Sequence, residues 1–132
     1  MSTPLMCIAL LGFLLVGLGF SVSMTRAKTE TNFGSATDPE DILYKMTRAH
    51  GNTAEYAPII ALLIFVLYQA TQAEWVMWCM ILATFFRYLI VAGIIFPKTM
   101  DAPNPMRFIG ALGTYLTGFG LCAAVFLQAL NT

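Results

Sequence analysis

Residues 75–96, WVMWCMILATFFRYLIVAGIIF, contain a single charged side chain, that of Arg87. A helix needs about 20 residues to cross the ~30 Å hydrocarbon core of a bilayer, so this segment is long enough to span it. Three further apolar runs occupy residues 5–24, 56–73 and 108–130. The sequence therefore predicts an all-α membrane protein, a four-transmembrane-helix bundle in a single domain. We expect that domain to cover residues 1–132, with helices at about 5–25, 39–72, 75–97 and 106–130.

The composition agrees with a membrane location. Of the residues, 58% are hydrophobic and 11% are charged, whereas about 25% are charged in soluble domains. Seven basic and seven acidic side chains give a net charge of zero, which excludes the basic surface that nucleic acid requires. We expect the first run to be a transmembrane helix rather than a signal peptide, because no basic residue precedes it and its apolar stretch is longer than ~7–15 residues.

Lysine and arginine gather in two of the predicted connections. The stretches between the first and second apolar runs and between the third and fourth contain Arg26, Lys28, Lys45, Arg48, Lys98 and Arg107. The turn between the second and third helices and both ends of the chain contain neither residue type. The positive-inside rule predicts that the two basic loops are cytoplasmic and that both termini lie on the opposite side. The compact loops favour a bacterial inner membrane over the endoplasmic reticulum.

The second predicted helix carries several polar residues near the point where it enters the membrane. The segment 37–41, TDPED, is typical of a helix start, with a capping side chain, a proline and early acidic residues. Arg48, Asn52 and Glu55 follow at positions i, i+4 and i+7, so they share one face of the helix. Either Arg48 and Glu55 simply lie at the membrane interface, or this face binds a ligand.

Arg87 lies too deep in the third apolar run to reach water easily. Placing an arginine at mid-span costs at least ~2.5–3.5 kcal/mol, so such a residue normally faces the interior of the bundle and pairs with a polar group. Glu55 is the only acidic residue predicted near the same depth. Two interpretations follow: a structural ion pair between Arg87 and Glu55, or a site that binds a charged small molecule.

The pattern Arg48-x-His50-x-Asn52-x-x-Glu55-x-x-Pro58 on a second transmembrane helix resembles the signature of the MAPEG family, the membrane-associated proteins in eicosanoid and glutathione metabolism. The chain length, the four spans, the large first cytoplasmic loop and the proline-led arginine before the fourth helix extend the resemblance over essentially the whole chain. Within the family the chain looks like a microsomal glutathione transferase. The resemblance implies a homotrimer with one glutathione site at each subunit interface.

The resemblance also implies roles for individual residues. The positions that match glutathione-binding positions of the family are Arg26, Arg48, Asn52, Glu55, Tyr56 and Arg107, and Arg87 matches a deep arginine of the third helix. Arg107 matches the arginine to which several members assign thiolate activation, so it is the predicted catalytic residue. The chain departs from the family in two respects: Ile90 and Ile94 stand where synthases carry tyrosine or histidine, and Gly51 stands where some members carry another arginine. Tyr88 and Tyr115 are the predicted substitutes for the missing hydroxyl groups.

The residue inventory suits glutathione, which has two carboxylates, one ammonium group and a thiol. Arginines match carboxylate geometry, Glu55 suits the ammonium group, and Asn52 suits the peptide amides. A guanidinium near the sulfur favours the thiolate, which is the nucleophile. We therefore expect a glutathione-dependent membrane transferase that conjugates lipophilic electrophiles and reduces lipid hydroperoxides as a side activity, with glutathione as co-substrate and with membrane lipids around it.

Two other functions remain open from the sequence. A small proton-coupled transporter would also have four helices in a short chain, but it needs a carboxylate deep in the first helix, and residues 1–25 contain none. A non-catalytic member of the same family would bind a lipid or glutathione without turning it over. No metal site is expected, because the three cysteines lie in different spans and form no Cys-x-x-Cys motif.

Overall fold

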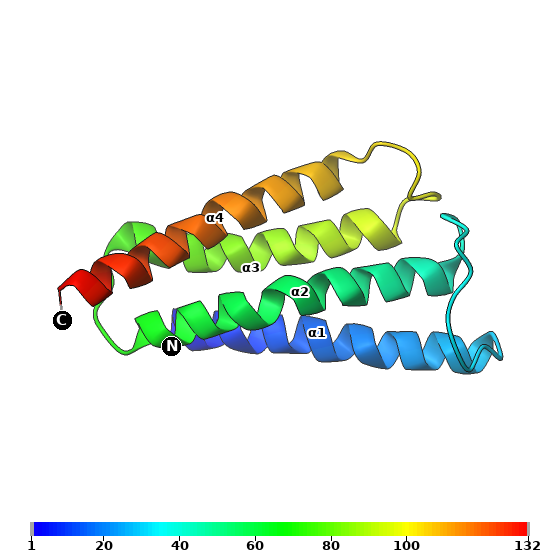
Figure 1. Cartoon of the computed structure of the whole chain (residues 1–132), viewed down its shortest axis with the longest axis horizontal. Coiled ribbons are helices and arrows are strands. Elements are labelled where there is room, and N and C mark those ends of the chain that lie inside the picture. Colours follow the sequence, from blue (N-terminus) through cyan, green and yellow to red (C-terminus); the bar gives the residue numbers. More distant parts are fainter. Residues whose placement is uncertain (1, 132) are drawn as a thin grey trace.

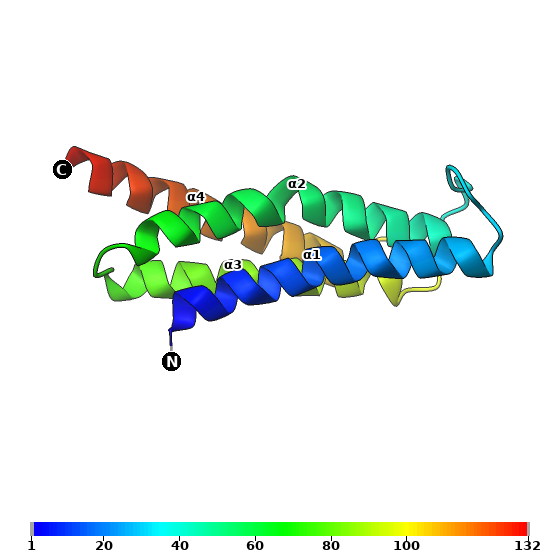
Figure 2. The same ribbon diagram turned by 90° about the horizontal axis from the view of Figure 1, so that it is seen from below.

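The chain forms four long helices that run side by side (Figures 1 and 2). A computed structural model describes residues 2–131. The helices are α1 (Thr3–Lys28), α2 (Ile42–Tyr68), α3 (Glu74–Ile95) and α4 (Pro105–Leu130). All four are long and apolar enough to cross a membrane. No strand occurs among the described residues, so the predicted all-α membrane bundle is confirmed and the protein is an integral, multi-pass membrane protein.

The two ends of the bundle differ in their connections. The N- and C-terminal ends lie together with the short α2–α3 turn, and the long α1–α2 and α3–α4 connections lie together at the opposite end (Figure 1). We call these the terminal end and the loop end. Every lysine and arginine except Arg87 belongs to the loop end by sequence. Because the chain has four spans, both ends of the described chain lie at one end of the bundle and the two long connections lie at the other.

Helix α2 begins three residues later than the sequence predicts. Asp41, rather than a residue of the 37–39 segment, is the N-cap, and its side chain accepts a hydrogen bond of 2.8 Å from the amide of Tyr44. Asp38 instead accepts from the amide of Glu40, at 2.9 Å, in a turn before the helix. Both aspartates can cap a helix, and the sequence does not distinguish them. The helix ends at Tyr68, so its 27 residues extend about 40 Å rather than the ~50 Å expected for 39–72.

Helices α2 and α3 form the middle of the bundle, and α1 and α4 lie on its two edges. Helix α1 packs mainly against α2, and α4 packs mainly against α3, whereas the described parts of α1 and α4 make no contact with each other. Glycine permits the close approach of α3 and α4: a Cβ atom on Gly110 would lie 2.8 Å from the backbone nitrogen of Ile90, and one on Gly93 would lie 2.7 Å from that of Arg107. Close helix packing in membranes depends on such small residues.

The two long connections are joined to each other at the loop end. The side chain of Lys45, in the first turn of α2, donates to the carbonyl oxygens of Pro97 and Lys98. The amide of Met100 donates to the carbonyl of Pro39, at 3.0 Å. By sequence, Lys45 is one of the basic residues expected on the cytoplasmic side, but in the structure it is buried, with 7% of its surface exposed. The loop end is therefore fixed by polar bonds rather than only by helix packing.

Candidate functional site

Arg87 lies in the interior of the bundle, as its position in the apolar run predicts. Only 1% of its surface is exposed. Its Nη2 atom donates to both oxygens of Asn52, at 2.6 Å to the side-chain oxygen and 3.0 Å to the backbone oxygen. The guanidinium carbon lies 5.0 Å from the ring centroid of Tyr56, within range of a cation–π interaction. Because Asn52 and Tyr56 are four residues apart, both project from the side of α2 that faces α3.

The ion pair between Arg87 and Glu55 does not form, so that interpretation of the sequence is wrong. Glu55 is exposed and makes no hydrogen bond or ion pair with any residue that the structure describes. It precedes Tyr56 by one position, and one residue turns a helix by about 100°. Glu55 therefore lies on the outer part of this helix face, where its charge still acts on Arg87, and the neutral amide of Asn52 is the group that bonds the guanidinium.

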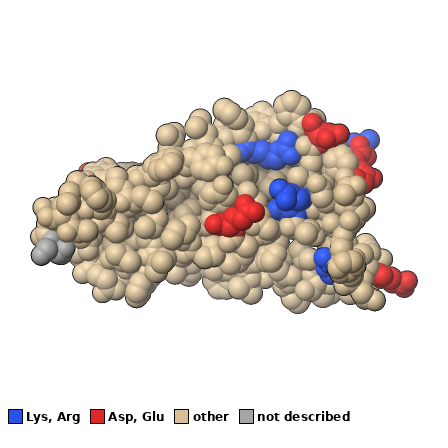
Figure 3. Space-filling view, in the orientation of Figure 1, with Lys and Arg blue, Asp and Glu red and all other residues tan. Residues whose placement is uncertain are grey.

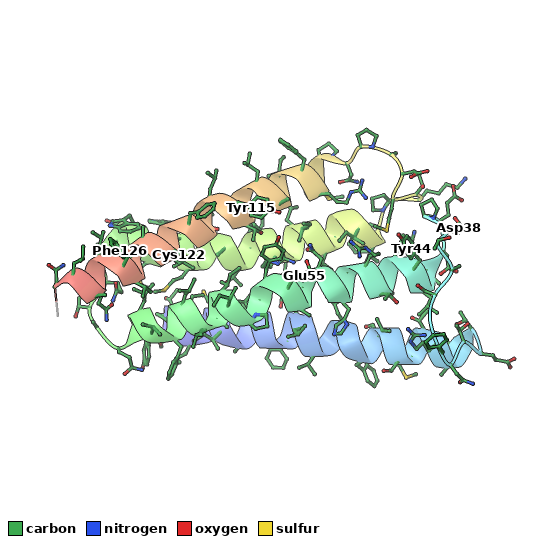
Figure 4. All side chains as sticks on the ribbon, viewed as in Figure 1. Asp38, Tyr44, Glu55, Tyr115, Cys122 and Phe126 are labelled. Carbon is green, nitrogen blue, oxygen red and sulfur yellow. The ribbon has the colours of Figure 1, made fainter. Side chains whose placement is uncertain are left out.

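Tyr115 brings helix α4 to the same site. Its hydroxyl oxygen lies 3.2 Å from the hydroxyl oxygen of Tyr56, and the two rings meet edge to face with centroids 5.9 Å apart. Figure 4 shows Tyr115 on α4 and Glu55 on α2 in the middle part of the bundle. Asn52, Tyr56, Arg87 and Tyr115, which we call the polar cluster, thus join three helices.

Two cavities border the polar cluster. The smaller, of about 50 Å³, is lined by all four members together with Ile90, Ala111 and Thr114. The Nε atom of Arg87 is buried and has no hydrogen-bond partner. The larger cavity, of about 310 Å³, is a groove between α2 and α4, which we call the α2–α4 groove. It shares Tyr56, Thr114 and Tyr115 with the smaller cavity, and most of its other walls are apolar. The two tyrosines therefore separate a polar space from an apolar one.

Charged side chains gather beside the cluster on the outer surface. Figure 3 shows basic and acidic groups on the half of this face nearer the loop end, whereas most of the other half is uncharged. Arg48 and Glu55 are both exposed residues of α2. Neither forms a hydrogen bond or an ion pair within the described chain, so each retains its full capacity to bind a charged ligand.

Arg107 and Arg26 are held by the backbone of their own loops. Arg107 donates from Nη1 to the carbonyl of Met100, at 2.8 Å, and from Nη2 to that of Ala102, at 2.9 Å. Arg26 donates to the carbonyl of Gly34, at 2.6 Å. Arg107 lies one turn before Ala111 on α4, so it is on the side of that helix that reaches the small cavity. Arg26 belongs to α1, on the opposite edge of the bundle from α4.

Two other residues clarify the site. His50 is half-buried against α1, because a Cβ atom on Gly19 would lie 3.3 Å from its Nε2 atom; this contact favours a packing role over that of a general base. Thr114 was not identified from the sequence, although it lines both cavities. Its spacing of three residues from Ala111 places it on the same face of α4, so counting helical positions from Arg107 would have found it.

Comparison of the sequence with models of protein families identifies the family of this chain. Residues 4–127 match the model of the MAPEG family. The chain belongs to the MAPEG family. The match includes nearly all of the four helices and the whole candidate site. Neither the curated proteins nor the solved structures contain a significant match to the chain.

MAPEG membership supports a role in glutathione transfer or in a related process. The family includes glutathione transferases and also non-catalytic members. In this MAPEG chain the polar cluster contains the half-buried second-helix residues Asn52 and Tyr56 and the buried third-helix residue Arg87. Arg48 and Glu55, from the same second-helix pattern, lie on the adjoining surface. Within the pattern, Asn52 therefore bonds Arg87 inside the bundle, whereas Arg48 and Glu55 remain exposed.

Proposed function

We propose that the protein is a glutathione-dependent membrane transferase. It activates the thiol of glutathione for conjugation to lipophilic electrophiles, and it reduces lipid hydroperoxides as a side activity. The observation that carries this proposal is the polar cluster beside the α2–α4 groove. A buried arginine with a hydrogen-bonding amide suits a polar peptide, and an adjoining apolar groove suits a second substrate that dissolves in the bilayer.

The charged side chains of the site are complementary to the charged groups of glutathione. Arg48, with the further guanidinium groups of Arg26 and Arg87, supplies cations for its two carboxylates, and arginine suits them because its planar fork matches a carboxylate. The unpartnered carboxylate of Glu55 suits the ammonium group. Asn52 is held by Arg87, so its amide has a fixed orientation toward a peptide group. Tyr56 and Tyr115 supply hydroxyl groups at the boundary of the groove.

A homotrimer completes this site. Arg26 and Arg107 belong to helices on opposite edges of one chain, and those helices do not touch. An arrangement in which α1 of one subunit lies beside α4 of the next brings both arginines to one ligand. Self-association also covers part of the apolar surface of α1 and α4, and membrane lipids cover the remainder.

Arg107 is the residue proposed to activate the thiol. A cation beside the sulfur favours the charged form and so lowers the pH at which the thiolate appears. The thiolate then forms a carbon–sulfur bond with the electrophile, and the leaving group departs with its electron pair. With a hydroperoxide, the thiolate attacks the O–O bond and yields an alcohol and the sulfenic acid of glutathione, which a second glutathione converts to the disulfide and water.

The test compares Arg107→Ala with Lys98→Ala, which removes an exposed cation from the same loop. For Arg107→Ala we expect that the thiolate of bound glutathione, followed by its ultraviolet absorbance, forms only at higher pH. We also expect turnover of a chlorinated dinitrobenzene to fall about 100-fold, the usual effect of losing a group that stabilises charge in a reaction. Lys98→Ala should retain both properties.

Calorimetric titration of the detergent-purified protein with glutathione separates the alternatives. Binding without thiolate formation in the wild type would identify a non-catalytic member of the family. An absence of binding at millimolar glutathione would reject the proposal. If Arg107→Ala kept the absorbance and the turnover of the wild type, the assignment of Arg107 would be wrong even though the enzyme assignment stood.

A further inference from the structure

Lys45 occupies an unusual position for a lysine. It is the fourth residue of α2, and only 7% of its surface is exposed. A positive charge near the N-terminus of a helix is unfavourable, because that end of the helix dipole is itself positive. A buried lysine normally needs a charged or polar partner, and Lys45 makes no ion pair with any residue in the described range. Its burial therefore requires compensation from another part of the fold.

The compensation comes from the end of α3. Lys45 Nζ lies 3.0 Å from the carbonyl oxygen of Pro97 and 3.2 Å from that of Lys98. These carbonyls follow directly after the C-cap Phe96, at the negative end of the α3 dipole. The lysine thus connects the start of α2 to the first residues of the α3–α4 connection.

The same connection holds the side chain of Arg107. Met100 has a central place in it: its amide donates to Pro39, at 3.0 Å, and its carbonyl accepts from Arg107 Nη1, at 2.8 Å. A second bond joins Arg107 Nη2 to Ala102, at 2.9 Å. A guanidinium has five N–H donors, so the two bonds orient Arg107 and leave three donors for a ligand.

The main chain of Arg107 is fixed separately. Its amide donates to the side chain of Asn104, at 3.2 Å, and its backbone packs against Gly93 so closely that a Cβ atom there would lie 2.7 Å away. Movement of the connection would therefore shift the guanidinium while the helix itself stayed in place. The direction of the guanidinium depends on the carbonyls of Met100 and Ala102, and those carbonyls depend on the bonds that hold the connection to α2.

We infer that Lys45 is a positioning residue for thiolate activation. It holds the α3–α4 connection through the carbonyls of Pro97 and Lys98, and the connection in turn directs Arg107 at the thiol. The inference rests on the proposed function of Arg107. Helix α2 then has two roles: Asn52 and Tyr56 bind the ligand, and Lys45, at the start of the same helix, positions Arg107.

The experiment measures the thiolate of bound glutathione as a function of pH in the full-length, detergent-purified protein. Lys45→Met keeps an unbranched apolar stem and removes the charge and the donors. We expect its thiolate to form at higher pH than in the wild type and kcat to fall about tenfold, because a small displacement of a catalytic group has a large effect on rate. The KM for glutathione should change less than twofold, since the binding residues are untouched.

Two variants serve as controls. Lys98→Met removes a cation from the same connection but keeps the backbone carbonyl that Lys45 binds, so it should match the wild type. Lys45→Gln retains one donor for a carbonyl and should give an intermediate thiolate curve. If Lys45→Met does not fold, the Gln variant is the deciding measurement.

The outcomes separate this inference from the proposed function. A wild type that binds glutathione without forming a thiolate contradicts the proposed function itself. A wild type that forms the thiolate, with folded Lys45 variants whose thiolate curve and kcat are unchanged, contradicts only the positioning role. A loss of thermal stability in Lys45→Met with an unchanged thiolate curve also contradicts it, because a purely structural lysine gives that result.

Discussion

At the scale of single residues, Asn52 stabilises the buried guanidinium group of Arg87. Both hydrogen bonds of the buried guanidinium go to Asn52, and Nε has no partner. Leaving a buried polar group unsatisfied costs about 1–3 kcal/mol, and more when the group is charged. The face of Tyr56 adds a cation–π interaction. The arginine is therefore retained in an apolar environment by two residues of one helix face.

The first residue-scale prediction concerns this pair. Asn52→Leu should lower the free energy of unfolding by about 3 kcal/mol, since it leaves the guanidinium without its side-chain acceptor. The double variant Asn52→Leu with Arg87→Met should be more stable than the single variant, because replacing both partners removes the unpaired charge. Thermal unfolding in detergent measures both variants. Equal stability of Asn52→Leu and the wild type would contradict the role of Asn52.

Arg87 also shows which part of the site the sequence can predict. Its inward orientation follows from the cost of exposing a cation to lipid. Its partner does not follow, because Arg48, Asn52 and Glu55 span a broad face of α2 and the spacing alone does not say which of them points at α3. The orientation is fixed by the packing of whole helices. Lys45 was missed for a related reason: a lysine near predicted basic loops is indistinguishable, in sequence, from a solvated one.

At the scale of elements, α3 and α4 owe their close contact to glycine. A Cβ atom on Gly110 would lie 2.8 Å from the backbone nitrogen of Ile90, whereas one on Gly118, two turns later on α4, would meet nothing within 4 Å. The backbone of α3 cannot move aside as a flexible side chain can. Each helix end was predicted to within four residues, because the apolar runs that cross the bilayer mark the helices, but the contacts of each helix depend on such local shapes.

These two glycines give a matched prediction. Gly110→Ala should lower the free energy of unfolding by about 2 kcal/mol, as overpacking of a core does. Gly118→Ala should leave it unchanged or raise it by up to about 1 kcal/mol, since alanine is the better helix former. Thermal unfolding of the two variants checks the difference. A Gly110→Ala protein as stable as Gly118→Ala would show that α3 and α4 are not in close contact.

At the scale of the whole molecule, the charges and the connections define a direction across the membrane. The two long connections meet at the loop end and carry the basic residues, and the short turn and both ends of the described chain meet at the terminal end (Figures 1 and 2). Such an asymmetry favours a cytoplasmic loop end. The number of spans could be predicted from hydropathy alone, because it depends on the bilayer rather than on tertiary contacts, and the side on which the loop end lies stays a prediction.

Reporter fusions test the orientation. In a bacterial host, alkaline phosphatase fused to the C-terminus should be active, and green fluorescent protein fused there should not fluoresce, because the positive-inside rule places that terminus outside the cytoplasm. Fusions truncated after Lys98, within the α3–α4 connection, should give the opposite result. A fluorescent C-terminal fusion would reverse the assigned direction.

The common position of the N- and C-terminal ends has a practical consequence for asymmetric experiments. Because the last described residue of one copy emerges on the same side of the bilayer as the first described residue of the next, a short flexible linker can join copies in tandem without an additional span. A concatenated gene can then place one altered copy among unaltered ones. If the protein is the proposed homotrimer, the activity of such a concatemer would measure whether a reaction centre uses an arginine of its neighbour.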